Sequence, residues 1–289
     1  MPHATTRDGV KLYYEEAGSG TPVLFVHEFA ADYRSWEPQM RYFSRLYRCI
    51  TYCARGYPPS DVPKDGAAYT YEHFRDDVIA MLDHLKIDKA HIVGLSMGGY
   101  SALMVGLRYP ERARSLTLAG TGSGSERALA DELRQGFLDI AKQFESEGSA
   151  AVAKVYGNGP TRVPYEVKDP RGHREFLEAL AAHDPQGSAH TMRNFQGKRP
   201  PVWEFEAELK KLAVPTLILL GDEDDPCIEP SIYLKQHIPT SGLAVLPKTG
   251  HTTNLEEPAL FNATVGDFLA RVDAGRWPAR DPRSIRPGR

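Results

Sequence analysis

Short runs rich in apolar residues recur along the chain and indicate strands that are buried on both faces of a sheet. They lie at residues 23–26, 90–93, 114–119, 214–220 and 243–246. Between two of these runs, Thr70 is a good N-cap for a helix whose apolar side chains, Phe74 and Val78 among them, share one face. This alternation of strand and helix predicts βαβ units and therefore a mostly parallel sheet.

The strand signals stop after residue 119 and return only at residue 214, and the interval contains helical patterns. Residues 128–147 place apolar side chains at steps of three and four, which is the stripe of one helix face. Shorter helical patterns lie at 149–155, 174–182 and 189–195. We therefore expect a helical cap over residues 123–205, inserted into a core made of residues 1–122 and 206–274. Residues 275–289 are rich in arginine and proline, and we expect an extended tail that could contact a second subunit.

One motif carries the clearest chemical signal. Residues 94–99, Gly-Leu-Ser-Met-Gly-Gly, place Ser96 between small residues directly after the apolar run at 90–93. The apolar positions that follow predict a helix, so the serine lies in a turn from strand to helix. In such an elbow the serine is strained, and Gly94 and Gly98 let the neighbouring backbone pass closely. An ordinary glycine-rich turn is the alternative interpretation of so short a motif.

A serine hydroxyl is a weak nucleophile at neutral pH, so this hypothesis requires a histidine base and an acid that orients it. The apolar run at 214–220 is followed by an acidic loop that contains Asp224, and the run at 243–246 is followed by His251. The order Ser96, Asp224, His251 along the chain is the order associated with this kind of elbow. Three such groups at the carboxyl ends of three apolar strands predict a catalytic triad.

These motifs together resemble the α/β-hydrolases of the Ser-Asp-His type, over nearly the whole chain from about Thr5 to about Leu269. Further stretches that carry the resemblance lie at residues 8–14, 109–112 and 250–261. The resemblance implies an α/β fold with a doubly wound, mostly parallel eight-stranded sheet and an inserted helical cap. It also implies that the acid is Asp224, with Asp225 as the nearest rival and Asp222 as a weaker one.

The resemblance further implies that the backbone N–H groups of Phe29 and Met97 form an oxyanion hole. The chain departs from the family here, because His27 is followed by Glu28 where most members have glycine. A carboxylate at this place would raise the energy of an anionic transition state. A partner or a proton must neutralise it, its side chain must turn away, or the chemistry must differ from plain ester hydrolysis. We expect Glu28 to be a structural member of an ion pair.

A second departure lies in the turn at residues 53–60, where Cys53 and Pro58 replace an acid and a glycine of the usual family pattern. In the usual strand order this turn lies beside the loop that carries Glu28. We therefore expect Arg55 to be the partner of Glu28, with Arg34 as the other candidate.

Composition narrows the class of protein further. The formal net charge of −3 gives no reason to expect nucleic acid or an anionic membrane as a partner. No apolar stretch is long enough for a membrane span, and the first residues lack the layout of a signal peptide. The cysteines Cys49, Cys53 and Cys227 cannot all pair and do not have metal-ligand spacing, so we expect reduced thiols in the cytoplasm.

These observations predict a serine hydrolase that cleaves a small carboxylic ester or lactone through an acyl-enzyme, without a metal or an organic cofactor. The small size of the substrate follows from the cap, which tends to enclose a modest pocket. Carbon–carbon bond hydrolysis, amide hydrolysis and cofactor-free perhydrolase chemistry are alternatives on the same fold. A receptor that binds a small ligand with little turnover is an alternative of another class.

Overall fold

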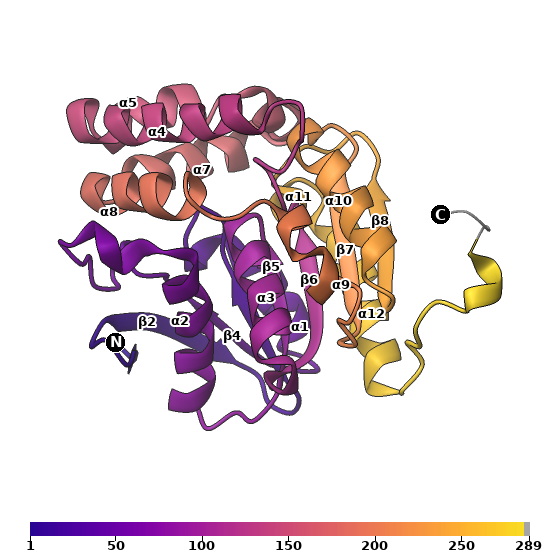
Figure 1. Cartoon of the computed structure of the whole chain (residues 1–289). Helices are drawn as coiled ribbons and strands as arrows, with labels where there is room; N and C mark the ends of the chain where they lie inside the picture. The colour runs from indigo at the N-terminus through magenta and orange to yellow at the C-terminus, as the bar shows by residue number, and fades with distance from the viewer. Residues whose placement is uncertain (286–289) are drawn as a thin grey trace.

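The computed structural model describes residues 1–285, and all eight strands of this part of the chain lie in one sheet (Figure 1). The strand order is β1-β2-β4-β3-β5-β6-β7-β8. The strands are β1 (His3–Thr5), β2 (Lys11–Ala17), β3 (Pro22–Val26), β4 (Arg48–Tyr52), β5 (Ala90–Leu95), β6 (Ala113–Ala119), β7 (Thr216–Gly221) and β8 (Ser241–Leu246). Pairs β1–β2 and β2–β4 are antiparallel and all other pairs are parallel. The predicted doubly wound, mostly parallel eight-stranded sheet is confirmed.

Helices cover both faces of the sheet and bury its central strands completely. Every residue of β5 and β7 is buried. Successive side chains of β3 enter opposite cores: Leu24 packs with residues of α2 (Tyr71–His84) and α3 (Met97–Arg108), and Phe25 packs with residues of α1 (Glu37–Phe43) and α12 (Pro258–Asp273). Burial on both faces explains why apolar residues occupy consecutive positions in these strands instead of alternating with polar ones.

The chain between β6 and β7 forms helices. Its elements are α4 (Ala130–Glu147), α5 (Ser149–Tyr156), η4 (Pro160–Arg162), α6 (Val163–Lys168), α7 (Pro170–Ala181), α8 (Pro185–His190), the π-helix η5 (Thr191–Gln196), η6 (Val202–Phe205) and α9 (Glu206–Leu209). Of these, α4, α5, α7 and α8 lie as a layer above the sheet in Figure 1, whereas α9 lies beside the strands. The helix predicted over 174–182 begins earlier, because the Asp169 side chain accepts a hydrogen bond from the Gly172 N–H and caps it. The residues of the helical pattern at 189–195 belong partly to α8 and partly to η5. The sequence pattern did not predict α6.

The remaining helices are η1 (Tyr33–Trp36), η2 (Gly66–Tyr69), η3 (Pro110–Arg112), α10 (Asp225–His237), α11 (Thr253–Glu256) and η7 (Pro282–Ser284). The tail after α12 leaves the body of the molecule in Figure 1, but Trp277 anchors its first part. The Trp277 ring lies 4.6 Å from that of Phe268, and its indole N–H donates to the Thr240 carbonyl at 2.8 Å. Of the predicted tail, residues 286–289 lie outside the described residues. Within residues 1–285, no helix has the length and apolarity needed to cross a membrane.

Candidate active site

Ser96 occupies a strained turn between β5 and α3. Its backbone has φ +53° and ψ −110°, a combination that residues other than glycine rarely adopt. A Cβ atom at Gly94 would overlap the Gly98 carbonyl oxygen, and one at Gly98 would overlap the Val26 carbonyl oxygen. The two glycines are therefore required by close backbone approach, as predicted. The turn holds the Ser96 side chain at the N-terminus of α3, beyond the carboxyl end of β5.

His251 and Asp224 lie together beside this turn. His251 Nδ1 donates to Asp224 Oδ2 at 2.8 Å, and both residues are buried. Asp225 is exposed at the start of α10, and Asp222 instead accepts a hydrogen bond from the Thr249 N–H at 3.1 Å. Of the three candidate acids, the fold thus brings Asp224 to the histidine.

The hydrogen bond to Asp224 fixes the protonation of the His251 ring. Because Nδ1 carries the donated proton, Nε2 of the neutral ring is free to accept one. Burial alone would lower the pKa of His251, but the charge and the hydrogen bond of Asp224 outweigh it and raise that pKa above its ordinary value. The imidazolium form is therefore stabilised at this position.

Ser96 and His251 line the same cavity, which has a volume of about 650 Å³ and lies between the core and the cap. Within residues 1–285, no hydrogen bond joins the Ser96 hydroxyl to His251. Hydrogen bonds between catalytic groups are often long in a free enzyme and tighten when substrate binds. The arrangement brings a hydroxyl, an imidazole and a carboxylate, the groups that the predicted triad requires, to one surface of the cavity.

Two backbone N–H groups near Ser96 are the candidates for the predicted oxyanion hole. Phe29 and Met97 are both buried, and neither of their N–H groups donates a hydrogen bond within the described part of the chain. Met97 is the first residue of α3, where backbone N–H groups have no partner in the helix and the helix dipole favours negative charge. These are the two donors that the family resemblance implied.

His27 orients one of these donors. Its Nε2 accepts a hydrogen bond from the Ala54 N–H at 3.0 Å, so its Nδ1 is protonated and donates to the Glu28 carbonyl at 2.6 Å. This bond fixes the peptide unit that joins Glu28 to Phe29. Because a trans peptide points its N–H opposite to its C=O, the Phe29 N–H is held as well. Sequence reasoning assigned no role to His27.

Glu28 forms a buried ion pair with Arg162 of the cap. Arg162 Nη1 donates to Glu28 Oε1 at 2.7 Å, and Nη2 donates to Oε2, so the pair is bidentate. Burial alone would raise the pKa of Glu28, but the Arg162 guanidinium outweighs it and holds that pKa below its ordinary value. Glu28 is therefore neutralised by a partner and not by a proton, and the expected ion pair exists.

The predicted partners of Glu28 are wrong. Arg55 points to the opposite side of its turn, where it donates to Asp77 of α2 at 2.6 Å and to Asp8 at 2.7 Å. Arg34 is occupied by Asp32, with Nη2 to Oδ2 at 2.6 Å. The turn that carries Arg55 has two carboxylates within reach on its own side, and these bind the guanidinium.

The ion pair also lies close to the histidine. Glu28 Oε2 is 3.8 Å from His251 Nε2. Next to Arg162, the Thr161 carbonyl accepts a hydrogen bond from the His251 N–H at 3.0 Å. The cap segment η4 therefore contacts the histidine backbone and, through Arg162, the carboxylate beside its ring.

We predict that Glu28→Gln destabilises the fold by about 3–5 kcal/mol, because it leaves the buried Arg162 guanidinium without its counter-charge. Urea unfolding monitored by circular dichroism measures this loss. The matched control is Glu37→Gln, which breaks the exposed pair with Arg41 and should change the stability much less. Equal effects of the two changes would contradict the structural role.

The same variant tests whether Glu28 also takes part in the reaction. With a structural role, activity per folded molecule should stay within about tenfold of the native value. An unchanged melting temperature with turnover reduced about a hundredfold would instead assign Glu28 to the chemistry. Glu28→Gly restores the residue usual in the family, and a structural role predicts equal or faster hydrolysis of an activated ester.

Cys227 is the cysteine nearest to this site. Its Sγ lies 4.0 Å from His251 Nδ1, and with Asp224 and His251 it forms a group of potential metal ligands. Burial and the Asp224 charge raise the pKa of the Cys227 thiol, which keeps it protonated, and His251 Nδ1 already donates to Asp224. These protonation states do not suit a metal site. Cys49, Cys53 and Cys227 are all buried and unpaired.

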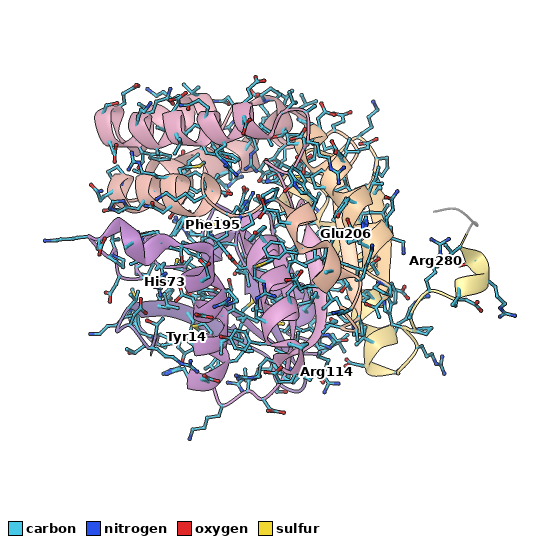
Figure 2. All side chains as sticks on the ribbon, in the orientation of Figure 1. Tyr14, His73, Arg114, Phe195, Glu206 and Arg280 are labelled. Atoms are coloured by element: carbon cyan, nitrogen blue, oxygen red, sulfur yellow. The ribbon has the colours of Figure 1, made fainter. Side chains whose placement is uncertain are left out.

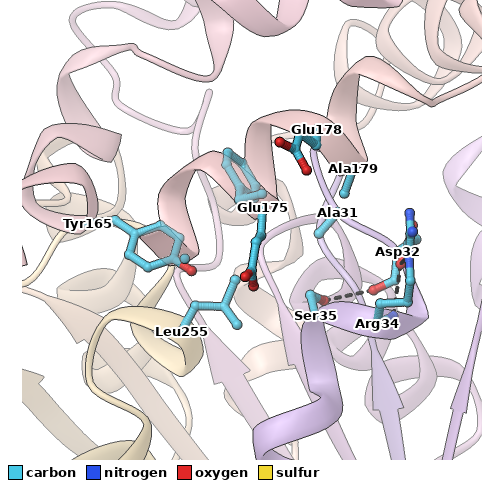
Figure 3. Close-up of a pocket in the computed structure, with 11 residues that line it drawn as sticks. Ala31, Asp32, Arg34, Ser35, Tyr165, Glu175, Glu178, Ala179 and Leu255 are labelled. Carbon is cyan, nitrogen blue, oxygen red and sulfur yellow. Dashed lines mark hydrogen bonds and ion pairs between the residues drawn. The ribbon is translucent and has the colours of Figure 1, made fainter. Parts of the chain in front are cut away.

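A second cavity, of about 380 Å³, lies beside α7 (Figure 3). Figure 3 shows Arg34 bound to Asp32 and the Ser35 side chain turned toward the same residue. The Ser35 hydroxyl donates to the Asp32 carbonyl at 2.7 Å. No histidine is among the described residues that line this cavity, so it lacks a serine–histidine arrangement like the one around Ser96.

Comparisons with known proteins agree with this fold. The family model described as "alpha/beta hydrolase fold" matches residues 21–258. The chain is 27% identical to 3-oxoadipate enol-lactonase 1 of Acinetobacter baylyi, covering 93% of this chain and 96% of that protein. It is 28% identical to 2-hydroxymuconate semialdehyde hydrolase of a Pseudomonas species, covering 92% and 93%. A thermophilic esterase from Thermogutta terrifontis has a similar structure, with a TM-score of 0.83, 26% identity, and coverage of 94% of this chain and 98% of that one.

Proposed function

Because the chain belongs to the alpha/beta hydrolase family, we propose that it is a serine hydrolase that cleaves a small carboxylic ester or lactone through an acyl-enzyme. The observation that carries this proposal is the 2.8 Å hydrogen bond between His251 and Asp224 in the wall of the cavity that contains Ser96. Relatives named as an enol-lactonase and an esterase support the choice of bond.

In the proposed reaction, the Ser96 oxygen attacks the substrate carbonyl while His251 Nε2 takes the hydroxyl proton. Asp224 holds the imidazolium through Nδ1, and the Phe29 and Met97 N–H groups bind the oxygen that becomes negative. His251 then returns the proton to the leaving alcohol, which leaves the acyl group on Ser96. Water attacks the acyl-enzyme with the same histidine as base, and the carboxylic acid is released.

The ion pair at Glu28 is compatible with this scheme. An unpaired carboxylate would oppose negative charge on the substrate oxygen, but the Arg162 guanidinium matches its charge. The same carboxylate, 3.8 Å from His251 Nε2, favours the imidazolium that forms during the attack. The chain can therefore replace the usual glycine with glutamate because the cap supplies an arginine.

The cavity suits a small substrate with an apolar part. Its volume of about 650 Å³ falls within the usual range for small-molecule sites. Leu133, Phe137 and Ile140 of α4 supply apolar surface on the side of the cap. An acyl chain or a lactone ring can lie against these side chains while its carbonyl reaches Ser96.

A substrate screen of the full chain tests this proposal. Purified protein is assayed with short-chain ethyl esters, lactones, amides and cleavable diketones, before and after treatment with a fluorophosphonate. We expect ester or lactone turnover that the fluorophosphonate removes. Cleavage of diketones alone would make the bond type wrong, and the absence of both turnover and labelling would overturn the serine mechanism.

The pH dependence gives a further prediction. Catalysis needs neutral His251, whose pKa lies above its ordinary value of 6.5, so kcat/KM should fall as the pH decreases through a value above 6.5. Glu28→Gln removes a charge that raises this pKa and leaves Arg162, which lowers it, so the inflection should move to lower pH. Initial rates between pH 5 and pH 9 at substrate concentrations below KM, in native protein and variant, measure the shift. An inflection that stays in place would contradict the contact between Glu28 and His251.

A further inference from the structure

Three arginines are buried in the described part of the chain, and one of them has no carboxylate partner. Arg55 pairs with Asp77 and Asp8, and Arg162 pairs with Glu28. Arg199 is only 6% exposed and forms no ion pair within residues 1–285. Burying a cation without a counter-charge has a large desolvation free energy and destabilises the fold, so the burial of Arg199 needs an explanation.

The surroundings of Arg199 hold its guanidinium in a fixed position. Its Nη2 donates to the Ser123 carbonyl at 2.6 Å, and its central carbon lies 4.8 Å from the centre of the Tyr100 ring and 5.5 Å from that of Phe195. Figure 2 shows Phe195 at the seam between the cap and the core. Aromatic faces stabilise a cation but do not satisfy its N–H groups. Arg199 Nη1 is buried and has no hydrogen-bond partner among the described residues.

Arg199 borders the cavity that contains Ser96 and His251. The nearby Gln196 borders the same cavity, and its buried Oε1 also has no hydrogen-bond partner within residues 1–285. Two unsatisfied polar groups at the same wall, next to the triad, are what a site built for a polar substrate group leaves open when it is empty. The second cation of this wall, Arg162, is already neutralised by Glu28.

We propose that Arg199 binds a carboxylate of the substrate, so that the preferred esters or lactones carry a second, free carboxylate group. This inference rests on the proposed function and names its substrate class. A guanidinium is suited to the task because its planar fork matches a carboxylate and stays charged. The bound anion supplies the counter-charge that the protein does not, and it fixes the distance between the carboxylate and the carbonyl that Ser96 attacks.

The mouth of the cavity does not oppose this assignment. Glu132 and Asp139 border the cavity on α4, but both are exposed to solvent. Exposed charges are screened by salt over about 8–10 Å, whereas a buried guanidinium is screened much less. Attraction at Arg199 therefore outweighs repulsion at the mouth.

The test compares two esters of matched shape, monoethyl glutarate and ethyl pentanoate, which differ in a terminal carboxylate. The native protein should have the higher kcat/KM for monoethyl glutarate. Arg199→Gln should lower the ratio of the two kcat/KM values at least about thirtyfold, since truncating one partner of a buried charge pair has effects of this size. Arg199→Lys keeps the charge but loses the planar fork and the stacking on Tyr100 and Phe195, so it should lower the ratio less than Arg199→Gln does. A purely structural arginine would lower both rates together and leave the ratio unchanged, which would overturn the inference.

Arg193→Gln is the matched control, because Arg193 lies six residues before Arg199 in the chain, in η5, but pairs with Glu145 at the surface of the cap. It should leave the ratio unchanged. Binding is measured separately by calorimetry with monoethyl glutarate, using Ser96→Ala and the double variant with Arg199→Gln. The double variant should bind at least about tenfold more weakly, and equal binding would also overturn the inference.

These measurements separate the two proposals. If both esters are cleaved at Ser96 with equal kcat/KM, the assignment of Arg199 is wrong and the serine hydrolase stands. If neither ester is cleaved and the fluorophosphonate does not label Ser96, the proposed function fails. The calorimetric comparison then decides the role of Arg199 by itself.

Discussion

Replacing Ser96 with alanine should lower kcat at least about a thousandfold and abolish labelling by a fluorophosphonate. The side chain at this position is the only group that the elbow presents to the cavity as a nucleophile, and the oxyanion donors and the pocket can supply only the residual rate. Alanine keeps the unusual backbone angles of Ser96, so the fold should tolerate the change. Ester hydrolysis and mass spectrometry of the labelled protein measure the two effects.

Ser101→Ala is the matched control for this variant. Ser101 lies one turn further along α3, and its buried hydroxyl donates to the Met97 carbonyl at 3.1 Å. Its loss should leave both labelling and rate close to native. Labelling of another residue, or a Ser96→Ala protein that keeps its activity, would refute the mechanism.

Replacing Asp224 with asparagine should lower kcat about ten thousandfold without unfolding the protein. An amide N–H facing His251 Nδ1 favours the tautomer with its proton on Nε2, and that tautomer cannot accept the serine proton. The 2.8 Å hydrogen bond between Asp224 and His251 makes this outcome specific to one carboxylate. Rates on an activated ester, with circular dichroism as the folding control, measure it.

Asp225→Asn is the neighbouring control. Asp225 is exposed and forms no hydrogen bond or ion pair with His251, so its loss should change the rate only slightly. If the two substitutions gave the reverse result, the acid of the triad would be Asp225 and not Asp224. Similar losses from both would indicate a general electrostatic effect of the acidic loop.

The core of the fold could be predicted because its strands are buried on both faces. The mostly apolar run at residues 90–93 predicts a central strand, and the structure gives β5 as Ala90–Leu95. Short cap helices gave weaker signals. Residues 163–168 form α6, but six residues do not show a helical period, and a proline occupies the first turn.

The partner of Glu28 could not be predicted, for a physical reason. Its position after β3 followed from the apolar run, and the need for a counter-charge followed from its burial beside an oxyanion. Arg162, however, lies 134 positions away in the sequence, in a segment whose placement depends on how the cap packs on the core. Arg55 was chosen because its turn is close, but proximity of a turn does not fix where a long side chain points.

The contact between η4 and the catalytic loop has a consequence for chimeric enzymes. Exchange of cap segments is an attractive way to alter the specificity of a hydrolase, since the cap supplies much of the pocket. In this chain a foreign cap without arginine at position 162 would leave the Glu28 carboxylate without a counter-charge beside the predicted oxyanion donors. The reverse graft, onto a core with glycine at position 28, would bury an unmatched guanidinium. Positions 28 and 162 are therefore coupled. A chimera that exchanges the cap should take both residues from the same parent protein.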